Sequence, residues 1–170
     1  EAEVLRRCFF RDWSEVAADL GLGSPEEFEA RVGASLQGVF LEAELFPLAR
    51  ALLEHCRAHN LQTALVTSSP RSVVGGVLTR LDLHALFDFT ICGDEVRNHK
   101  PHPEPVTTAL AALGLGPREA VMIGDSHADI LAGKAAGTRT ALYLPDDHHR
   151  FHDTDRLRAT GPDHIFDDHA

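Results

Sequence analysis

From Pro47 onward, the sequence alternates amphipathic stretches with short apolar runs, the pattern of a parallel sheet covered by helices. The predicted helices are Pro47–His59, Pro70–Leu81, Pro103–Leu113 and Asp129–Ala136. The predicted strands are Gln62–Thr67, Phe89–Cys92, Val121–Ile123 and Thr138–Leu144, with a short edge strand at Pro162–Phe166. This order predicts an α/β fold with a doubly wound, Rossmann-like parallel sheet.

Two carboxylates follow the strand Val121–Ile123. Asp125 lies at the tip of this strand and Asp129 four positions later, where the next helix is expected to begin. The spacing turns both toward one face, and the strand end places them in the crevice where open α/β sheets bind ligands. A pair of hard oxygen ligands suits Mg²⁺ better than zinc. The alternative is an N-cap aspartate followed by an ordinary surface helix that carries one more acid.

Hydroxyl groups and a lysine follow the other strand ends. Thr67 closes the strand Gln62–Thr67 and is followed by Ser68, and together they offer hydroxyl and backbone N–H groups for an anion. The alternative for this pair is a cluster that caps the next helix. Lys100 stands in a proline-stiffened loop after the second strand, where a lone lysine is usually solvated. A neutral donor, a cation and metal ligands at one sheet edge suit a phosphoryl group.

With these motifs the chain resembles the haloacid dehalogenase superfamily, in its phosphatase branch of phosphoglycolate phosphatases and β-phosphoglucomutases. The matching segments are Leu65-Val66-Thr67-Ser68-Ser69, Lys100-Pro101-His102-Pro103, Ile123-Gly124-Asp125-Ser126-His127-Ala128-Asp129 and Ala132-Gly133-Lys134-Ala135-Ala136-Gly137. Their order and spacing together are far more specific than one short motif. The resemblance covers roughly residues 44 to 168.

The resemblance implies a role for each matching residue in Mg²⁺-dependent hydrolysis of a small phosphorylated metabolite. Thr67 would bind the phosphoryl group, with contacts from Ser68, and Lys100 would neutralise its charge and orient the nucleophile. Asp125 would bind Mg²⁺ directly. Asp129 would either support the metal or hold Lys100.

The nucleophilic motif of this family, Asp-x-Asp-Gly-Thr at the end of an N-terminal strand, is absent from the sequence. Asp12 is no substitute, because it stands in a stretch of helical pattern with no apolar strand before it. In relatives the missing strand lies between the strands that here end at Thr67 and Gly124. We therefore expect the natural protein to carry an upstream segment with the nucleophilic Asp, and the 170-residue chain alone to be inactive.

The remaining N-terminal region is helical in pattern. By the resemblance, residues 1–43 would form part of a small helical cap that closes over the site, and residues 44–170 an α/β core that lacks its first strand. Two alternatives to a phosphatase stay open. One is a sugar phosphomutase of the same family, and the other is a catalytically inactive binding module, if the natural chain lacks the nucleophile.

Composition excludes other classes of function. The formal net charge of −10 and the lack of a basic block argue against nucleic acid as a partner. No apolar run reaches membrane-spanning length, and three scattered cysteines argue for a reducing compartment, so we expect a cytoplasmic protein. Substrate identity and oligomeric state do not follow from the sequence.

Histidines gather after Pro145. His148, His149 and His152, with neighbouring aspartates, offer ligands for a transition metal. The sequence favours a polar mobile loop here, because these residues lack the fixed ligand spacing of known metal motifs.

Overall fold

The structure is a computed structural model of the 170-residue chain, and it describes residues 18, 21, 42–150 and 152–168. The helices are α4 (Ala49–Ala58), α5 (Arg71–Arg80), α6 (Glu104–Leu113), α7 (His127–Ala136) and α8 (Thr154–Ala159). The strands are β1 (Ala64–Val66), β2 (Phe89–Ile91), β3 (Val121–Gly124), β4 (Arg139–Tyr143) and β5 (His164–Phe166). Short 3-10 helices are η1 (His84–Leu86), η2 (Gly93–Glu95), η3 (Pro117–Glu119) and η4 (Asp146–Arg150).

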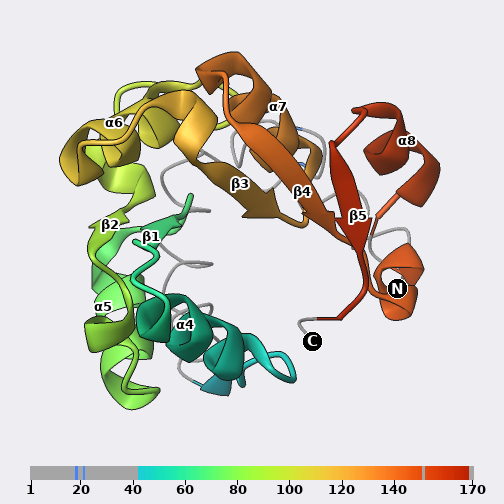
Figure 1. The fold of residues 1–170 in the computed structure, drawn as a ribbon. Coiled ribbons are helices and arrows are strands. Elements are labelled where there is room, and N and C mark those ends of the chain that lie inside the picture. The colour runs from blue at the N-terminus through green and yellow to red at the C-terminus, as the bar shows by residue number, and fades with distance from the viewer. Residues whose placement is uncertain (1–17, 19–20, 22–41, 151, 169–170) are drawn as a thin grey trace.

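The strands form two parallel sheets (Figure 1). In the first, β1 pairs with β2, with Ala64 opposite Phe89. In the second, β4 lies between β3 and β5, with Val121 opposite Arg139 and Ala141 opposite His164. No hydrogen-bonded pairing joins β1 to β3 among the described strands. This two-part sheet is the arrangement that the expectation of a missing intermediate strand requires.

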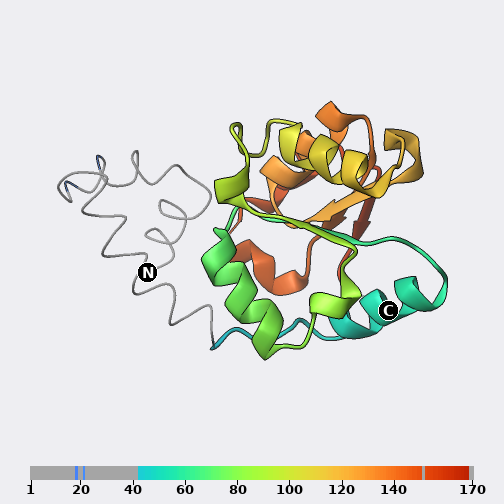
Figure 2. The ribbon, with the colours of Figure 1, turned by 90° about the vertical axis from the view of Figure 1, so that its left-hand side faces the viewer.

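Helices cover both faces of β1. Leu65 packs into a cluster with Val74 and Leu78 of α5, whereas the next residue, Val66, packs against the cluster that contains Val106 of α6. Successive strand residues point to opposite faces, so the apolar residues of β1 pack against helices on both faces of the sheet. Figure 2 shows the same layering, with α6 on one side of these strands and α4 and α5 on the other.

Helices α6 and α7 hold the two sheets together. They pack side by side, α6 on β1 and β2 and α7 on β3 and β4 (Figure 1). Their shared apolar core contains Leu110 of α6, Met122 of β3 and Ala132 of α7. Gly133 permits the close approach of α7, because a Cβ at this position would lie 2.7 Å from Cβ of Met122. The strand ends that carry the candidate residues are therefore positioned by helix packing.

Every helix and strand predicted from Pro47 onward is present, with ends that differ by up to two residues. Helix α7 begins at His127 instead of Asp129, because Ser126 is its N-cap. Helix α8 was not predicted from the sequence, although the side chain of Asp153 caps it by accepting the Arg156 N–H. The cap predicted at residues 1–43 lies almost wholly outside the described residues, so its boundary with the core stays a prediction.

The described cysteines are free thiols. Cys92 is buried in the core, and burial raises the pKa of its thiol, whereas Cys56 is half-buried on α4. Among the described helices, none has the length and apolar character needed to cross a membrane.

Candidate functional site

Thr67 directly follows β1. Its backbone N–H donates to Ile91 O at 3.1 Å, which extends the pairing with β2, and its Oγ1 accepts the Ser69 N–H at 3.1 Å. Thr67 is half-buried and Ser68 is exposed. The alternative that this cluster caps α5 is wrong, because the N-cap is Pro70 with no side-chain cap, and the Arg71 N–H donates to Asp94 instead. The hydroxyl of Thr67 therefore stands at the strand tip in a tight turn.

The turn after β1 is held against the end of β2. The Gly93 N–H donates to Ser69 O at 2.9 Å. A Cβ at position 93 would lie 2.2 Å from the backbone oxygen of Ser68, so only glycine permits this approach. The contact fixes the course of the Thr67 turn.

Lys100 reaches from its loop to the end of β1 and to helix α7, which packs on the second sheet. Its Nζ donates to Val66 O, at the end of β1, at 3.0 Å and to Oδ1 of Asp129, on α7, at 2.6 Å. The two side chains of the ion pair are only 10% and 8% exposed. The carboxylate of Glu104 accepts the Arg97 N–H and so links the two ends of the loop that contains Lys100. This hydrogen bond lowers the pKa of Glu104. Lys100 is thus a fixed cation, and the alternative of a solvated loop lysine is wrong.

Both oxygens of Asp129 are engaged by protein donors. Oδ1 accepts from Lys100, and Oδ2 accepts from Oγ of Ser126 at 2.7 Å and from its N–H at 3.1 Å. Gly124 makes room for this carboxylate, because a Cβ there would lie 2.3 Å from Cβ of Asp129. Ser126 and Gly124 belong to the sequence motif, but the motif alone predicted no role for either of them. A serine followed three residues later by an acid at a helix start was the signal for the cap.

Asp125 is half-buried just beyond the end of β3. Its carboxylate takes part in none of the hydrogen bonds between described side chains, unlike that of Asp129. A ring nitrogen of His148 and one of His152 lie near one of its oxygens, all three atoms being within 4.8 Å of one another. Burial lowers the pKa of His152, which favours its neutral form. His148 is itself buried and lies in the short helix η4, which the expectation of a polar mobile loop did not include.

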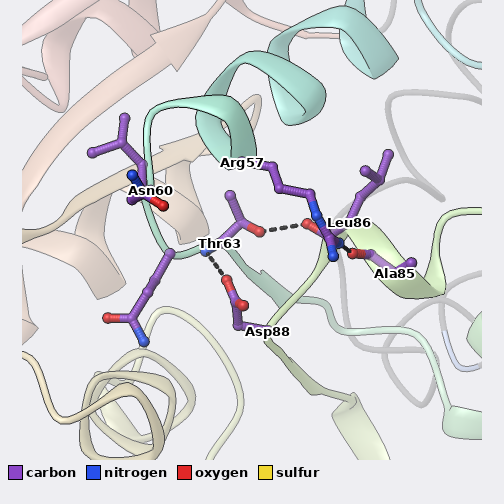
Figure 3. Close-up of a pocket in the computed structure, with 8 residues that line it drawn as sticks. Arg57, Asn60, Thr63, Ala85, Leu86 and Asp88 are labelled. Atoms are coloured by element: carbon purple, nitrogen blue, oxygen red, sulfur yellow. Dashed lines mark hydrogen bonds between the residues drawn. The ribbon is translucent and has the colours of Figure 1, made fainter.

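A polar cavity of about 250 Å³ lies at the other end of β1, away from Thr67 (Figure 3). Several of its polar groups are paired with one another: the Thr63 N–H donates to Oδ2 of Asp88 at 2.8 Å, and Oγ1 of Thr63 donates to Leu86 O at 2.5 Å. Arg57 donates to Ala85 O. These bonds join the start of β1 to the η1–β2 connection, so we assign this cavity a structural role.

Comparison with known proteins agrees with this geometry. A sequence profile described as haloacid dehalogenase-like hydrolase matches residues 18–143. The chain belongs to this family. Among its relatives is a phosphoglycolate phosphatase of Shigella boydii, 34% identical over 137 residues, which are 81% of the chain and 46% of that protein. A pyrophosphatase, PpaX, of Bacillus pumilus is 49% identical over 77 residues, 45% of the chain and 36% of its own length.

A solved structure, titled a putative beta-phosphoglucomutase from Thermotoga maritima, is 30% identical with a TM-score of 0.72. The match covers 89% of the chain and 69% of that structure. The chain thus spans about half or less of the two curated relatives and shares the haloacid dehalogenase-like fold.

Proposed function

We propose that this haloacid dehalogenase-like chain is part of a Mg²⁺-dependent hydrolase of small phosphate monoesters. The reaction would pass through an aspartyl phosphate, whose nucleophilic Asp stands on a segment preceding Glu1 in the natural protein. The observation that carries the proposal is the buried Lys100–Asp129 pair, which fixes a cation beside the end of β1. A fixed cation beside a hydroxyl-bearing turn is the arrangement that binding a phosphoryl dianion needs.

Each side chain has a part in this proposal. Thr67 donates its hydroxyl to a phosphoryl oxygen, and Ser68 adds contacts from the same turn. Lys100 offsets the negative charge of the phosphoryl group and orients the nucleophile, while Asp129 acts as a positioning residue for Lys100. The engagement of both Asp129 oxygens supports this role over direct metal binding.

Asp125 fits the metal that the family implies. Its half-buried carboxylate at the strand tip is not used by donors among the described side chains, and carboxylate oxygen is the ligand type that Mg²⁺ prefers. Further oxygen ligands would come from the preceding segment and from the phosphate itself. When bound there, Mg²⁺ supplies positive charge against the phosphoryl oxygens.

The proposed reaction has two displacements at phosphorus. In the first, the Asp carboxylate forms a bond to phosphorus as the bond to the ester oxygen breaks, and the leaving alkoxide takes up a proton. In the second, water cleaves the acyl phosphate and releases inorganic phosphate. Residues 1–43, as a cap, would exclude bulk water during the first displacement.

The names of the relatives, a phosphoglycolate phosphatase and a pyrophosphatase, support a small phosphorylated substrate. The location that goes with this proposal is the cytoplasm, with which the free thiols Cys56 and Cys92 are consistent. A sugar phosphomutase is the second candidate, favoured by the 30% identity to the Thermotoga maritima protein. An inactive binding module remains the outcome if the natural protein has no nucleophile upstream.

The test uses the protein expressed from its natural gene, after its N-terminus has been sequenced. ³²P-labelled aryl phosphate or 2-phosphoglycolate is mixed with the protein and Mg²⁺, and the reaction is quenched in acid within milliseconds. The proposal predicts label bound to protein and released by hydroxylamine, as expected of an acyl phosphate, followed by free phosphate. In a parallel reaction with a hexose 1-phosphate, an isomerised sugar phosphate in place of free phosphate would indicate the mutase. Absence of labelled protein with every substrate would indicate the binding module.

A further inference from the structure

A second group of possible ligands, His148 and His152, lies beside Asp125. His148 lies in η4, and His152 follows one helical turn later, with its N–H donating to His148 O at 2.9 Å. The centroids of the two imidazole rings are 5.3 Å apart. This turn places two histidines four residues apart on one side, the spacing at which helical side chains meet.

The fold brings this histidine pair to the carboxylate of Asp125. One ring nitrogen from His148, one from His152 and one oxygen from Asp125 all lie within 4.8 Å of one another. Donor atoms bound at about 2.0–2.1 Å to a single zinc ion are at most ~4.2 Å apart, so a small side-chain adjustment brings all three into coordination range. We call Asp125, His148 and His152 the Asp-His-His cluster.

His148 gives a second, independent sign of a ligand. Its side chain is buried, and its Nδ1 has no hydrogen-bond partner among the described residues. Aromatic rings border it, with the ring centroid of Tyr143 at 5.7 Å and that of Phe46 at 6.4 Å. A buried polar nitrogen without a partner is costly, and coordination to a cation is one way to satisfy a histidine nitrogen.

We propose that the Asp-His-His cluster binds a divalent transition metal ion of the zinc type. Two imidazoles and one carboxylate are a ligand set that zinc and its neighbours in the first row accept, with positions left for water or substrate. Mg²⁺ does not compete well for the imidazoles, because it prefers oxygen ligands. The two metals share Asp125, so occupancy of the cluster withdraws that carboxylate from Mg²⁺.

This inference does not depend on phosphatase activity, because the cluster consists of residues within the chain and its occupancy is read without substrate. The test uses the naturally expressed protein, purified without a histidine tag and freed of metal. Co²⁺ is the probe, since its visible absorption reports coordination by histidine, and Zn²⁺ is then added to displace it. The variants are His152→Gln and Asp125→Asn, because replacing the buried His148 perturbs the core.

The matched control is His149→Gln, which removes an exposed histidine from the same 3-10 helix. Circular dichroism and urea midpoints first establish that each variant is folded. We expect Co²⁺ binding to weaken by roughly 100-fold or more in His152→Gln and Asp125→Asn, and to stay unchanged in His149→Gln. The proposal is overturned if the wild type shows no histidine-type Co²⁺ spectrum. It is also overturned if Asp125→Asn binds like wild type, or if His149→Gln weakens binding as much as His152→Gln.

Discussion

Removing one charge of the Lys100–Asp129 pair is expected to destabilise the protein strongly. The two side chains are 10% and 8% exposed, and their atoms Nζ and Oδ1 are 2.6 Å apart. Loss of one partner leaves a largely buried charge without its counter-ion, which typically costs about 3–5 kcal/mol. We take the lower end, about 3 kcal/mol, because the remaining partner keeps another hydrogen bond in each case: Lys100 to Val66 O, or Asp129 from Ser126.

A double-mutant cycle isolates the interaction between the two charges. Lys100→Met and Asp129→Asn remove one charge each with little change of shape, and the double variant removes both. We expect each single variant to lose about 3 kcal/mol and the double variant about 4 kcal/mol, which is a coupling of about 2 kcal/mol. The free energy of unfolding is measured by urea titration of the naturally expressed protein.

The control is Glu54→Gln, which breaks the exposed pair between Arg50 and Glu54 on α4, whose charged atoms are 3.7 Å apart. That change is expected to cost less than about 0.5 kcal/mol. If Lys100→Met and Asp129→Asn prove additive within about 0.5 kcal/mol, the two residues do not form the buried pair described here, and the reasoning fails.

Three further substitutions test the packing and the acid stability of the fold. Gly124→Ala places a methyl group 2.3 Å from Cβ of Asp129 and is expected to lower the free energy of unfolding by roughly 2 kcal/mol or more. Gly75→Ala, inside α5 with open space around it, is expected to raise the free energy of unfolding by up to ~1 kcal/mol. Equal urea midpoints for the two variants would contradict this expectation. The carboxylate of Asp163 accepts hydrogen bonds from the hydroxyl and the N–H of Thr140, and these bonds lower the pKa of Asp163. The ionised carboxylate therefore stabilises the fold at neutral pH, and this stabilisation is lost as the pH falls through the lowered pKa. Asp163→Asn should therefore flatten the acid limb of a plot of unfolding midpoint against pH, and an unchanged slope would refute it.

Much of the fold was predictable because its signals are local. The apolar runs at Leu65 and Met122 and the helices between them follow from periodicity alone. The start of α7 was placed two residues late, because the prediction relied on Asp129 and overlooked the reciprocal cap with Ser126. Helix α8 was missed, because its short polar sequence has no apolar period and depends on the Asp153 cap.

The sequence predicted which residues belong to the candidate site, but it did not predict the hydrogen bonds and close contacts that join them. The motifs placed Lys100 and Asp129 at one edge, and the sequence left open whether Asp129 supports a metal or holds the lysine. The bond to Val66 O and the close contact at Gly124 depend on tertiary packing that no local pattern reports. The burial of His148 depends on two aromatic neighbours. Phe46 is distant from it in sequence, and Tyr143 belongs to strand β4, so the local sequence around His148 does not report either contact.

The central claim is that Asp125 belongs to a Mg²⁺-dependent phosphoryl-transfer site. The most direct measurement is steady-state phosphate release from an aryl phosphate by the naturally expressed protein and its Asp125→Asn variant, with Asp155→Asn on the exposed surface of α8 as the control. We predict that release requires Mg²⁺ and falls by roughly 1,000-fold in Asp125→Asn, with the control unchanged. Release that is independent of Mg²⁺, or an Asp125→Asn variant with the wild-type rate, would contradict the claim.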